Sequence, residues 1–223
     1  GCNSACDSSL LEGNPIHEDM TEACAMLEPD FLLNTVFTPD GAVSEIVAGH
    51  WYEAWEKGCQ DLLKMAGVKI KELADVVIAS AGGYPKDLNL YQSIKCHMNA
   101  TFAVKKGGIM IFTLDCEDIK EPAIFTDCFS RSNLEQFEKD IREAFTVPAF
   151  VAFKGRNILS DVTAYLVTRP ENFDFVKRTG HIPCATLEEA WSLAQAKLAK
   201  QGKHDYTITI MGHGSATLPI LEQ

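Results

Sequence analysis

Three polar side chains, Tyr91, Gln92 and Lys95, follow a pair of glycines at helical spacing. With Asp87 as the expected N-cap of this helix, Tyr91 and Lys95 stand at i and i+4. Gln92 and Lys95 stand at i and i+3, so all three side chains project from neighbouring turns of one face. Because free backbone N–H groups and the helix dipole favour negative charge at a helix N-terminus, this spacing predicts an anion-binding site.

The glycines belong to residues 80–85, which read Ser-Ala-Gly-Gly-Tyr-Pro and separate the apolar run 76–79 from the helical segment. This pattern is typical of a turn from a strand into a helix. Adjacent glycines let the backbone approach a ligand closely, which makes Gly82 and Gly83 candidate binding positions. An ordinary turn before a helix whose polar side chains face water remains the alternative.

Composition narrows the classes of partner. The 223-residue chain is 46% hydrophobic and 23% charged, with 20 Lys and Arg against 31 Asp and Glu, for a net charge of −11. This balance argues against nucleic acid or an anionic membrane as the main partner. No apolar run approaches the roughly 20 residues that span a bilayer, and no signal peptide is evident. Eight irregularly spaced cysteines indicate a cytoplasmic protein with reduced thiols.

The first 71 residues predict a small incomplete segment. Asn14 and Pro15 predict a helix start, and the helix should run to about Leu27. Two strands over 31–37 and 42–48 flank a Pro-Asp-Gly turn and predict a hairpin. A helix over 51–65 carries an apolar stripe that includes Trp51 and Trp55, which we expect to be core. Residues 68–74 are the expected boundary, giving domains 1–71 and 72–223.

The remaining residues predict an α/β domain. The glycine-containing turn, its helix and a strand over 109–114 form a β-α-β unit, which requires parallel strands. Residues 115–131 look irregular. Further helices are expected from a capping box at Ser132 and Glu135 through residue 145, over 148–159, and from a second capping box at Thr186 to residue 202. Strands over 162–167 and 206–211 complete a mostly parallel sheet with flanking helices.

Other constellations are weaker. His181 and Cys184 have the spacing of metal ligands, as do Cys2 and Cys6. A closed zinc site needs four ligands, and nothing in the sequence indicates that the fold brings these two pairs together. We therefore expect scattered thiols and no zinc site. Cys96 and His97 are neighbours on a helix and should diverge. Residues 212–215, Gly-His-Gly-Ser, are similar to an oxyanion loop, but the nucleophile-elbow pattern of serine hydrolases is absent.

Several short motifs, in order, resemble the lactate racemase family, whose members use a nickel-pincer nucleotide. The resemblance covers nearly the whole chain and is most specific from residue 75 to residue 111. The matching motifs are Gly13-Asn14-Pro15, Glu18-Asp19-Met20, Phe31-Leu32-Leu33-Asn34, Val47-Ala48-Gly49, Gly82-Gly83-Tyr84-Pro85 and Tyr91-Gln92-Ser93-Ile94-Lys95.

The resemblance implies a two-domain α/β enzyme with its active site between the domains. A histidine takes the hydroxyl proton of a 2-hydroxy acid while hydride passes to the cofactor and returns to either face. Gln92 and Lys95 would face the substrate, with Lys95 orienting a carboxylate, and Tyr91 would form the cleft wall. Gly82, Gly83 and Tyr84 would lie towards the cofactor.

The family's cofactor-tethering lysine, nickel-ligand histidines and catalytic histidines would precede Gly1, and none of the six histidines here sits in a matching motif. The resemblance therefore implies the C-terminal half of such a protein, with 1–71 as the remnant of its catalytic domain. We expect no catalytic residue, no metal and no bound cofactor in this fragment. The family's second-domain tryptophan has no counterpart in 133–160, so the substrate can differ from lactate.

Two other functions remain open. The chain can be a non-catalytic nucleotide- or anion-binding module that kept the scaffold, or, from its cysteine count alone, a thiol-based redox regulator. A half cut from a two-domain protein would also expose apolar surface, so we expect self-association as well as a missing N-terminal partner half.

Overall fold

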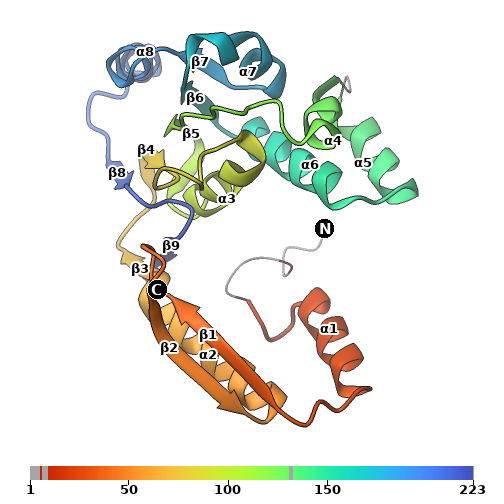
Figure 1. Ribbon diagram of the computed structural model, residues 1–223. Helices are drawn as coiled ribbons and strands as arrows, with labels where there is room; N and C mark the ends of the chain where they lie inside the picture. Colours follow the sequence, from red (N-terminus) through yellow and green to blue (C-terminus); the bar gives the residue numbers. More distant parts are fainter. Residues whose placement is uncertain (1–5, 7–9, 131–132, 223) are drawn as a thin grey trace. The chain divides into compact units, whose positions relative to one another are not determined.

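The computed structural model describes residue 6, residues 10–130 and residues 133–222 (Figure 1). The chain divides into two compact units, Gly1–Gly67 and Val68–Gln223. Strand β3 (Gly67–Ile70) pairs with β9 (Leu218–Leu221), which ties residues 68–70 to the second unit. The structural division therefore falls four residues before the boundary at residue 71 that the sequence suggests. Neither β3 nor β9 was expected from the sequence.

The first unit contains two helices and a hairpin. Helix α1 (Pro15–Ala25) begins at the N-cap Asn14, whose side chain accepts hydrogen bonds from the N–H groups of Ile16 and His17. Strands β1 (Leu32–Phe37) and β2 (Val43–Gly49) pair antiparallel, which confirms the predicted hairpin. Helix α2 (Trp51–Ala66) follows and packs along both strands (Figure 1).

The core of this first unit is small. Among its described hydrophobic residues only Val36, Val47 and Ala54 are buried. Trp51 and Trp55 are half-buried, and Trp55 stacks on His17 with ring centroids 4.7 Å apart. The prediction that the tryptophan stripe is core is therefore wrong, because the described residues of this unit provide too little apolar surface to cover it.

The second unit is built on a five-stranded sheet in the order β7-β6-β5-β4-β8, and all its strands are parallel. This confirms the predicted α/β class and the parallel sheet. The strands are β4 (Ala74–Ser80), β5 (Val104–Thr113), β6 (Thr163–Val167), β7 (Ile182–Cys184) and β8 (Ile208–Met211). Strand β4, between β5 and β8, is almost wholly buried because helices cover both of its faces.

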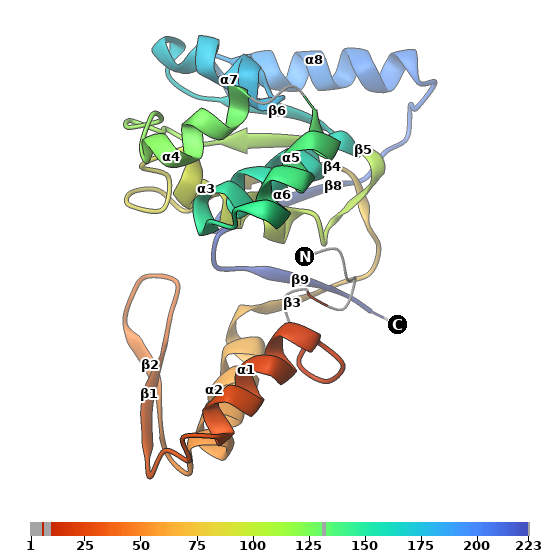
Figure 2. The ribbon, with the colours of Figure 1, turned by 90° about the vertical axis from the view of Figure 1, so that its right-hand side faces the viewer.

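Helices form one layer on each side of this sheet (Figure 2). One face packs against α3 (Leu90–Ala100), α6 (Val147–Ser160) and residues of α5 (Leu134–Glu143) and α7 (Phe173–Thr179). The opposite face packs against α8 (Leu187–Lys200) through Ala190, Ala194 and Leu198. Alternate residues of β4, β5 and β6 therefore belong to two separate hydrophobic clusters.

Several local expectations need correction. Residues 115–131 contain α4 (Ala123–Thr126) and the 3-10 helix η1 (Asp127–Ser130), and the short η2 (Pro170–Asn172), α7 and β7 were also missed. Helix α5 is capped by Asn133, whose side chain accepts from the Gln136 N–H, while Ser132 lies outside the described residues. The N-cap at Thr186 is confirmed, with its hydroxyl accepting from the Glu189 N–H at 3.2 Å, while the Glu189 carboxylate accepts from the Ala185 N–H at 2.7 Å.

Within the part of the chain that the structure describes, no helix combines the length and the apolar character needed to cross a membrane.

Candidate functional site

The sheet of the second unit has a topological switch point between β4 and β8. From β4 the chain crosses through α3 to β5 on one side, whereas β8 joins β4 on the other side. In parallel sheets ligands bind outside the carboxyl ends of strands at such a point. Two glycine-containing segments follow these ends: the glycine turn, residues 80–85, and the histidine loop, residues 212–215.

The glycine turn requires its glycines. Gly82 and Gly83 have φ values of +100° and +79°, in a region that other residues rarely adopt. A Cβ at Gly82 would lie 2.9 Å from Nδ1 of His213, whereas a Cβ at Gly83 would meet no described atom within 4 Å. The space beside Gly82 is therefore filled by the histidine, and Gly83 offers the open backbone.

Tyr84, the next residue of the glycine turn, is 78% exposed. An exposed aromatic ring of this size at the carboxyl edge of a sheet is a surface that a ligand or another polypeptide can cover.

Helix α3 begins two residues later than expected. Asn89, with extended φ and ψ, is the N-cap, and its side chain accepts from the Gln92 N–H at 2.9 Å. The prediction of Asp87 as the cap is wrong because residues 85–88 first complete a turn, in which the Leu88 N–H donates to the Pro85 carbonyl. The Asp87 carbonyl instead accepts from the Cys116 N–H at 2.9 Å, which ties the helix start to the end of β5.

The three predicted anion-site residues differ in exposure. Lys95 is exposed and forms no ion pair with any described residue, while Gln92 is half-buried one turn earlier. Tyr91 is half-buried, and its ring packs edge-on against Phe125 with centroids 5.4 Å apart. Gln92 and Lys95 are therefore available to a ligand from α3, and Tyr91 contributes mainly to the packing of α4 against that helix.

One further residue of α3 faces the same way. Asn99 stands four residues after Lys95 and seven after Gln92, which places the three on one side of the helix. The Asn99 amide donates to the carbonyl of Gly214 at 2.8 Å, so the histidine loop runs beside this side. Sequence reasoning missed Asn99 and compared residues 212–215 only with an oxyanion loop. The carboxyl ends of parallel strands share one edge, which could have linked residues 80–85 to 212–215.

A second polar group lies at the carboxyl ends of β5 and β6. Arg169 donates two hydrogen bonds to Asp115, with Nε–Oδ1 and Nη2–Oδ2 distances of 2.7 and 2.6 Å. The hydrogen bond from Arg169 lowers the pKa of the Asp115 carboxyl. Because the guanidinium already pairs with the Asp115 carboxylate through two hydrogen bonds, it is not free to bind another anion.

His181 and Cys184 do not form the zinc pair that their spacing suggested. His181 is buried, and its Nε2 lies 2.9 Å from Nε2 of His97. No group of three or more His, Cys, Asp or Glu among the described residues could hold a metal ion. Cys2 lies outside the described residues. The hydroxyl of Ser215 is buried without a hydrogen-bond partner among the described residues, so no described base activates it.

Two buried thiols, Cys96 and Cys116, are unlike those of a redox regulator. The seven described cysteines are free. Burial raises the pKa of Cys96 to about 12 and, as the largest cause, raises that of Cys116 to about 12. Reactive cysteines need a lowered pKa and access to solvent, so these two buried thiols are suited to packing.

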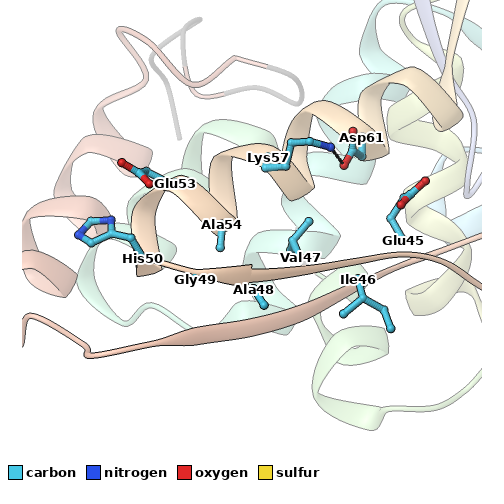
Figure 3. Close-up of a pocket in the computed structure, with 10 residues that line it drawn as sticks. All are labelled: Glu45, Ile46, Val47, Ala48, Gly49, His50, Glu53, Ala54, Lys57 and Asp61. Carbon is cyan, nitrogen blue, oxygen red and sulfur yellow. Dashed lines mark hydrogen bonds and ion pairs between the residues drawn. The ribbon is translucent and has the colours of Figure 1, made fainter.

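The first unit has a polar groove of about 330 Å³ between β2 and α2 (Figure 3). His50 and Glu53 lie towards one end, and an ion pair between Lys57 and Asp61 lies on the helix side. Three carboxylates line the groove, Glu45, Glu53 and Asp61, against the single lysine Lys57. This groove therefore offers no match to the anion site that the sequence predicts on α3.

The second unit is thus a doubly wound α/β domain with a candidate anion site at its topological switch point. Residues 69–218 match the model of the lactate racemase C-terminal domain. The chain belongs to the lactate racemase family.

Comparisons with individual relatives agree with this family assignment. The chain is 31% identical over 201 residues to the lactate racemase of Thermoanaerobacterium thermosaccharolyticum, covering 88% of this chain and 47% of the relative. It is 32% identical over 108 residues to the lactate racemase of Lactiplantibacillus plantarum, covering 48% of this chain and 25% of the relative. The chain therefore spans about half or less of these relatives.

Solved structures show the same relationship. The lactate racemase apoprotein from Thermoanaerobacterium thermosaccharolyticum superposes with a TM-score of 0.86 at 28% identity, covering 99% of this chain and 52% of that one. A crystal structure of a Thermotoga maritima protein gives a TM-score of 0.63 at 15% identity, covering 94% and 54%, which supports the fold alone.

Proposed function

We propose that this chain is the C-terminal half of a lactate racemase-like isomerase that acts on a 2-hydroxy acid or a related hydroxylated compound. The observation that carries the proposal is the position of Lys95 and Gln92 on α3, beside the switch point of a domain that matches the family. The role of this half is to bind and orient the substrate.

The chemistry of the two side chains suits a 2-hydroxy acid. The Lys95 ammonium is exposed and unpaired among the described residues, so it can neutralise a carboxylate. The Gln92 amide, one turn nearer the helix start, can both donate to and accept from a hydroxyl group. Charge-assisted hydrogen bonds of this kind fix the orientation of a small anion. A racemase needs a fixed orientation because its substrate must present both faces to the reacting group.

The nickel-pincer nucleotide of the family supplies a hydride acceptor when it is bound. No set of three or more metal-binding side chains among the described residues fits nickel, so we assign the metal site to the other half of the protein and expect no cofactor on this half alone. Within this chain, Gly83 and Tyr84 are the open positions that could approach the cofactor, while Gly82 is covered by His213.

The missing partner is, we propose, the N-terminal half of the same protein. Four apolar residues project from the outer face of the hairpin, where Phe37 pairs with Val43 in the strand register, and where Leu33 and Ile46 lie on the same side. Their exposed fractions are 67% for Leu33, 53% for Phe37, 53% for Val43 and 65% for Ile46. A hairpin that is apolar on both faces fits the inside of a larger domain, and relatives twice as long provide the residues to cover it.

The free thiols support a cytoplasmic location for this protein, because reduced cysteines are usual in the cytosol. Because the net charge of the chain is negative, we propose that neither nucleic acid nor a membrane is its partner.

A non-catalytic anion-binding module is the second candidate, and the same unpaired Lys95 would serve it. The two functions are separated by assaying the complete polypeptide that contains this chain, loaded with cofactor, for interconversion of the D and L forms of lactate and other 2-hydroxy acids. We expect each single enantiomer to approach a racemic or epimeric mixture. Binding of these acids without interconversion would favour the module.

A further inference from the structure

His213 lies at the end of β8 with an exposed side chain that forms no hydrogen bond with any described residue. Its Nδ1 occupies the space beside Gly82, where a Cβ would approach within 2.9 Å. A histidine that is unpaired and close to the glycine turn can donate or accept a hydrogen bond at neutral pH.

The backbone of the histidine loop is held on two sides. The Gly214 N–H donates to the carbonyl of Ser80 at 2.7 Å, and the Gly214 carbonyl accepts from the Asn99 amide at 2.8 Å. A Cβ at Gly214 would lie 2.6 Å from Sγ of Cys96, so only glycine permits this close approach to α3. The position of the neighbouring His213 is therefore set by both the glycine turn and the helix.

The same loop contains an unsatisfied polar atom. The Ser215 hydroxyl is buried and has no hydrogen-bond partner among the described residues. Buried polar groups are nearly always hydrogen-bonded in native proteins. The Ser215 hydroxyl is therefore a second polar group of the histidine loop without a described partner.

We propose that His213 is a further substrate-positioning residue, whose imidazole donates a hydrogen bond to the carboxylate of the 2-hydroxy acid held by Lys95 and Gln92. The link is helix α3: Asn99, which binds the histidine loop, shares one side of the helix with both residues. This inference rests on the proposed function, because it requires a carboxylate at that side of α3.

The test is an NMR titration of this chain with selectively labelled histidine, with L-lactate as the probe. A carboxylate bound to the imidazole changes the surroundings of the ring, so we expect lactate to shift the ring signals of His213 in a saturable way. His204 is also exposed and serves as the internal reference, which should not respond. Sodium chloride at the same ionic strength controls for screening.

The backbone amides of Gln92 and Lys95, followed in the same samples, separate the two levels of the proposal. Lactate-dependent shifts at both amides with no change at His213 would overturn the role of His213 and leave the proposed function intact. No response at α3 or at His213 would overturn both for this class of ligand.

Two variants sharpen the result. His213→Gln should weaken lactate binding by about three- to tenfold, the usual effect of losing one exposed hydrogen bond. His204→Gln changes the same residue type before the start of β8, whereas His213 follows its end, so it should leave the dissociation constant unchanged. Equal dissociation constants for His213→Gln and the parent chain would contradict the assignment.

Discussion

Nε2 of His97 lies 2.9 Å from Nε2 of His181, and both rings are buried in the second unit. His97 Nδ1 is 3.0 Å from the carbonyl of Ser93, which can only accept, so this nitrogen carries the proton. His97 Nε2 must then accept from His181 Nε2. The remaining nitrogen of His181 lies 2.8 Å from the hydroxyl oxygen of Thr179, which is also 2.7 Å from the Val176 carbonyl. Burial lowers the pKa of both rings, so both histidines are neutral in the folded protein at neutral pH.

This neutral pair predicts acid sensitivity. Burial lowers the pKa of His97 to about 4 from 6.5, and burial also lowers that of His181. Because the unfolded chain binds these protons first, stability should fall as the pH drops from about 6.5 to about 4, by roughly 3 kcal/mol for His97 alone. Denaturant unfolding at a series of pH values measures this loss.

The control for that measurement is the double variant His97→Leu/His181→Leu. It lacks both titrating groups, so its free energy of unfolding should change less between pH 6.5 and pH 4, whatever its absolute value. An unchanged pH dependence in this variant would assign the acid sensitivity to other groups.

Asp75 predicts a second contribution to stability. Its side chain is 8% exposed and accepts from Lys105 at 2.8 Å and from Lys203 at 2.7 Å. Hydrogen bonds from Lys105 and then Lys203 are the main causes that lower the pKa of Asp75. Stability from this group is present above about pH 4 and is lost as the pH falls further.

Asp75→Asn should therefore lower the free energy of unfolding at pH 7 by about 2–3 kcal/mol, because Lys105 and Lys203 then lose their buried negative partner. Asp115→Asn is the matched control, because it removes a more exposed carboxylate, and its effect should stay below about 1 kcal/mol. Equal effects would show that burial does not distinguish the two sites.

The glycine turn predicts a difference between two neighbouring substitutions. Gly82→Ala and Gly83→Ala both strain a positive φ, but only a Cβ at Gly82 meets His213. Gly82→Ala should displace the imidazole and change its ring chemical shifts, whereas Gly83→Ala should leave them nearly unchanged. Identical His213 spectra in the two variants would contradict the packing described for this turn.

The outer face of the hairpin predicts self-association of the isolated chain. Leu33 and Ile46 are 67% and 65% exposed, and contiguous apolar surface of this kind promotes association. Light scattering should detect species larger than a monomer, and Leu33→Lys/Ile46→Lys should reduce them. Leu193→Lys, at a 41% exposed position of α8, is the control and should not. A monomer at high concentration would count against the proposed interface.

Much of the fold could be predicted because its signals are local. The apolar runs of β4 to β6 predicted a parallel sheet, and Pro-Asp-Gly predicted the hairpin. Cap positions were less certain, since Asp87 and Asn89 are both good N-caps and only the turn at 85–88 decides between them. The strands β3, β7 and β9 have three or four residues each, which is too short for a clear hydrophobic period.

The candidate site was predictable only in part. Gln92 and Lys95 share a helix face, which follows from their spacing alone. The contact of His213 with Gly82 and the pairing of His97 with His181 join residues far apart in the sequence, so they depend on strand order. The packing of Tyr91 on Phe125 likewise depends on α4, a helix that the sequence did not reveal.

The central claim is that this half orients the substrate through Lys95, and kinetics of the complete, cofactor-loaded polypeptide test it most directly. Lys95→Ala should lower kcat/KM for the hydroxy acid by about 10²-fold or more, because a positioned charge is lost. Lys106→Ala removes an exposed lysine of β5 and should leave it unchanged. A loss of less than about threefold for Lys95→Ala would contradict the claim.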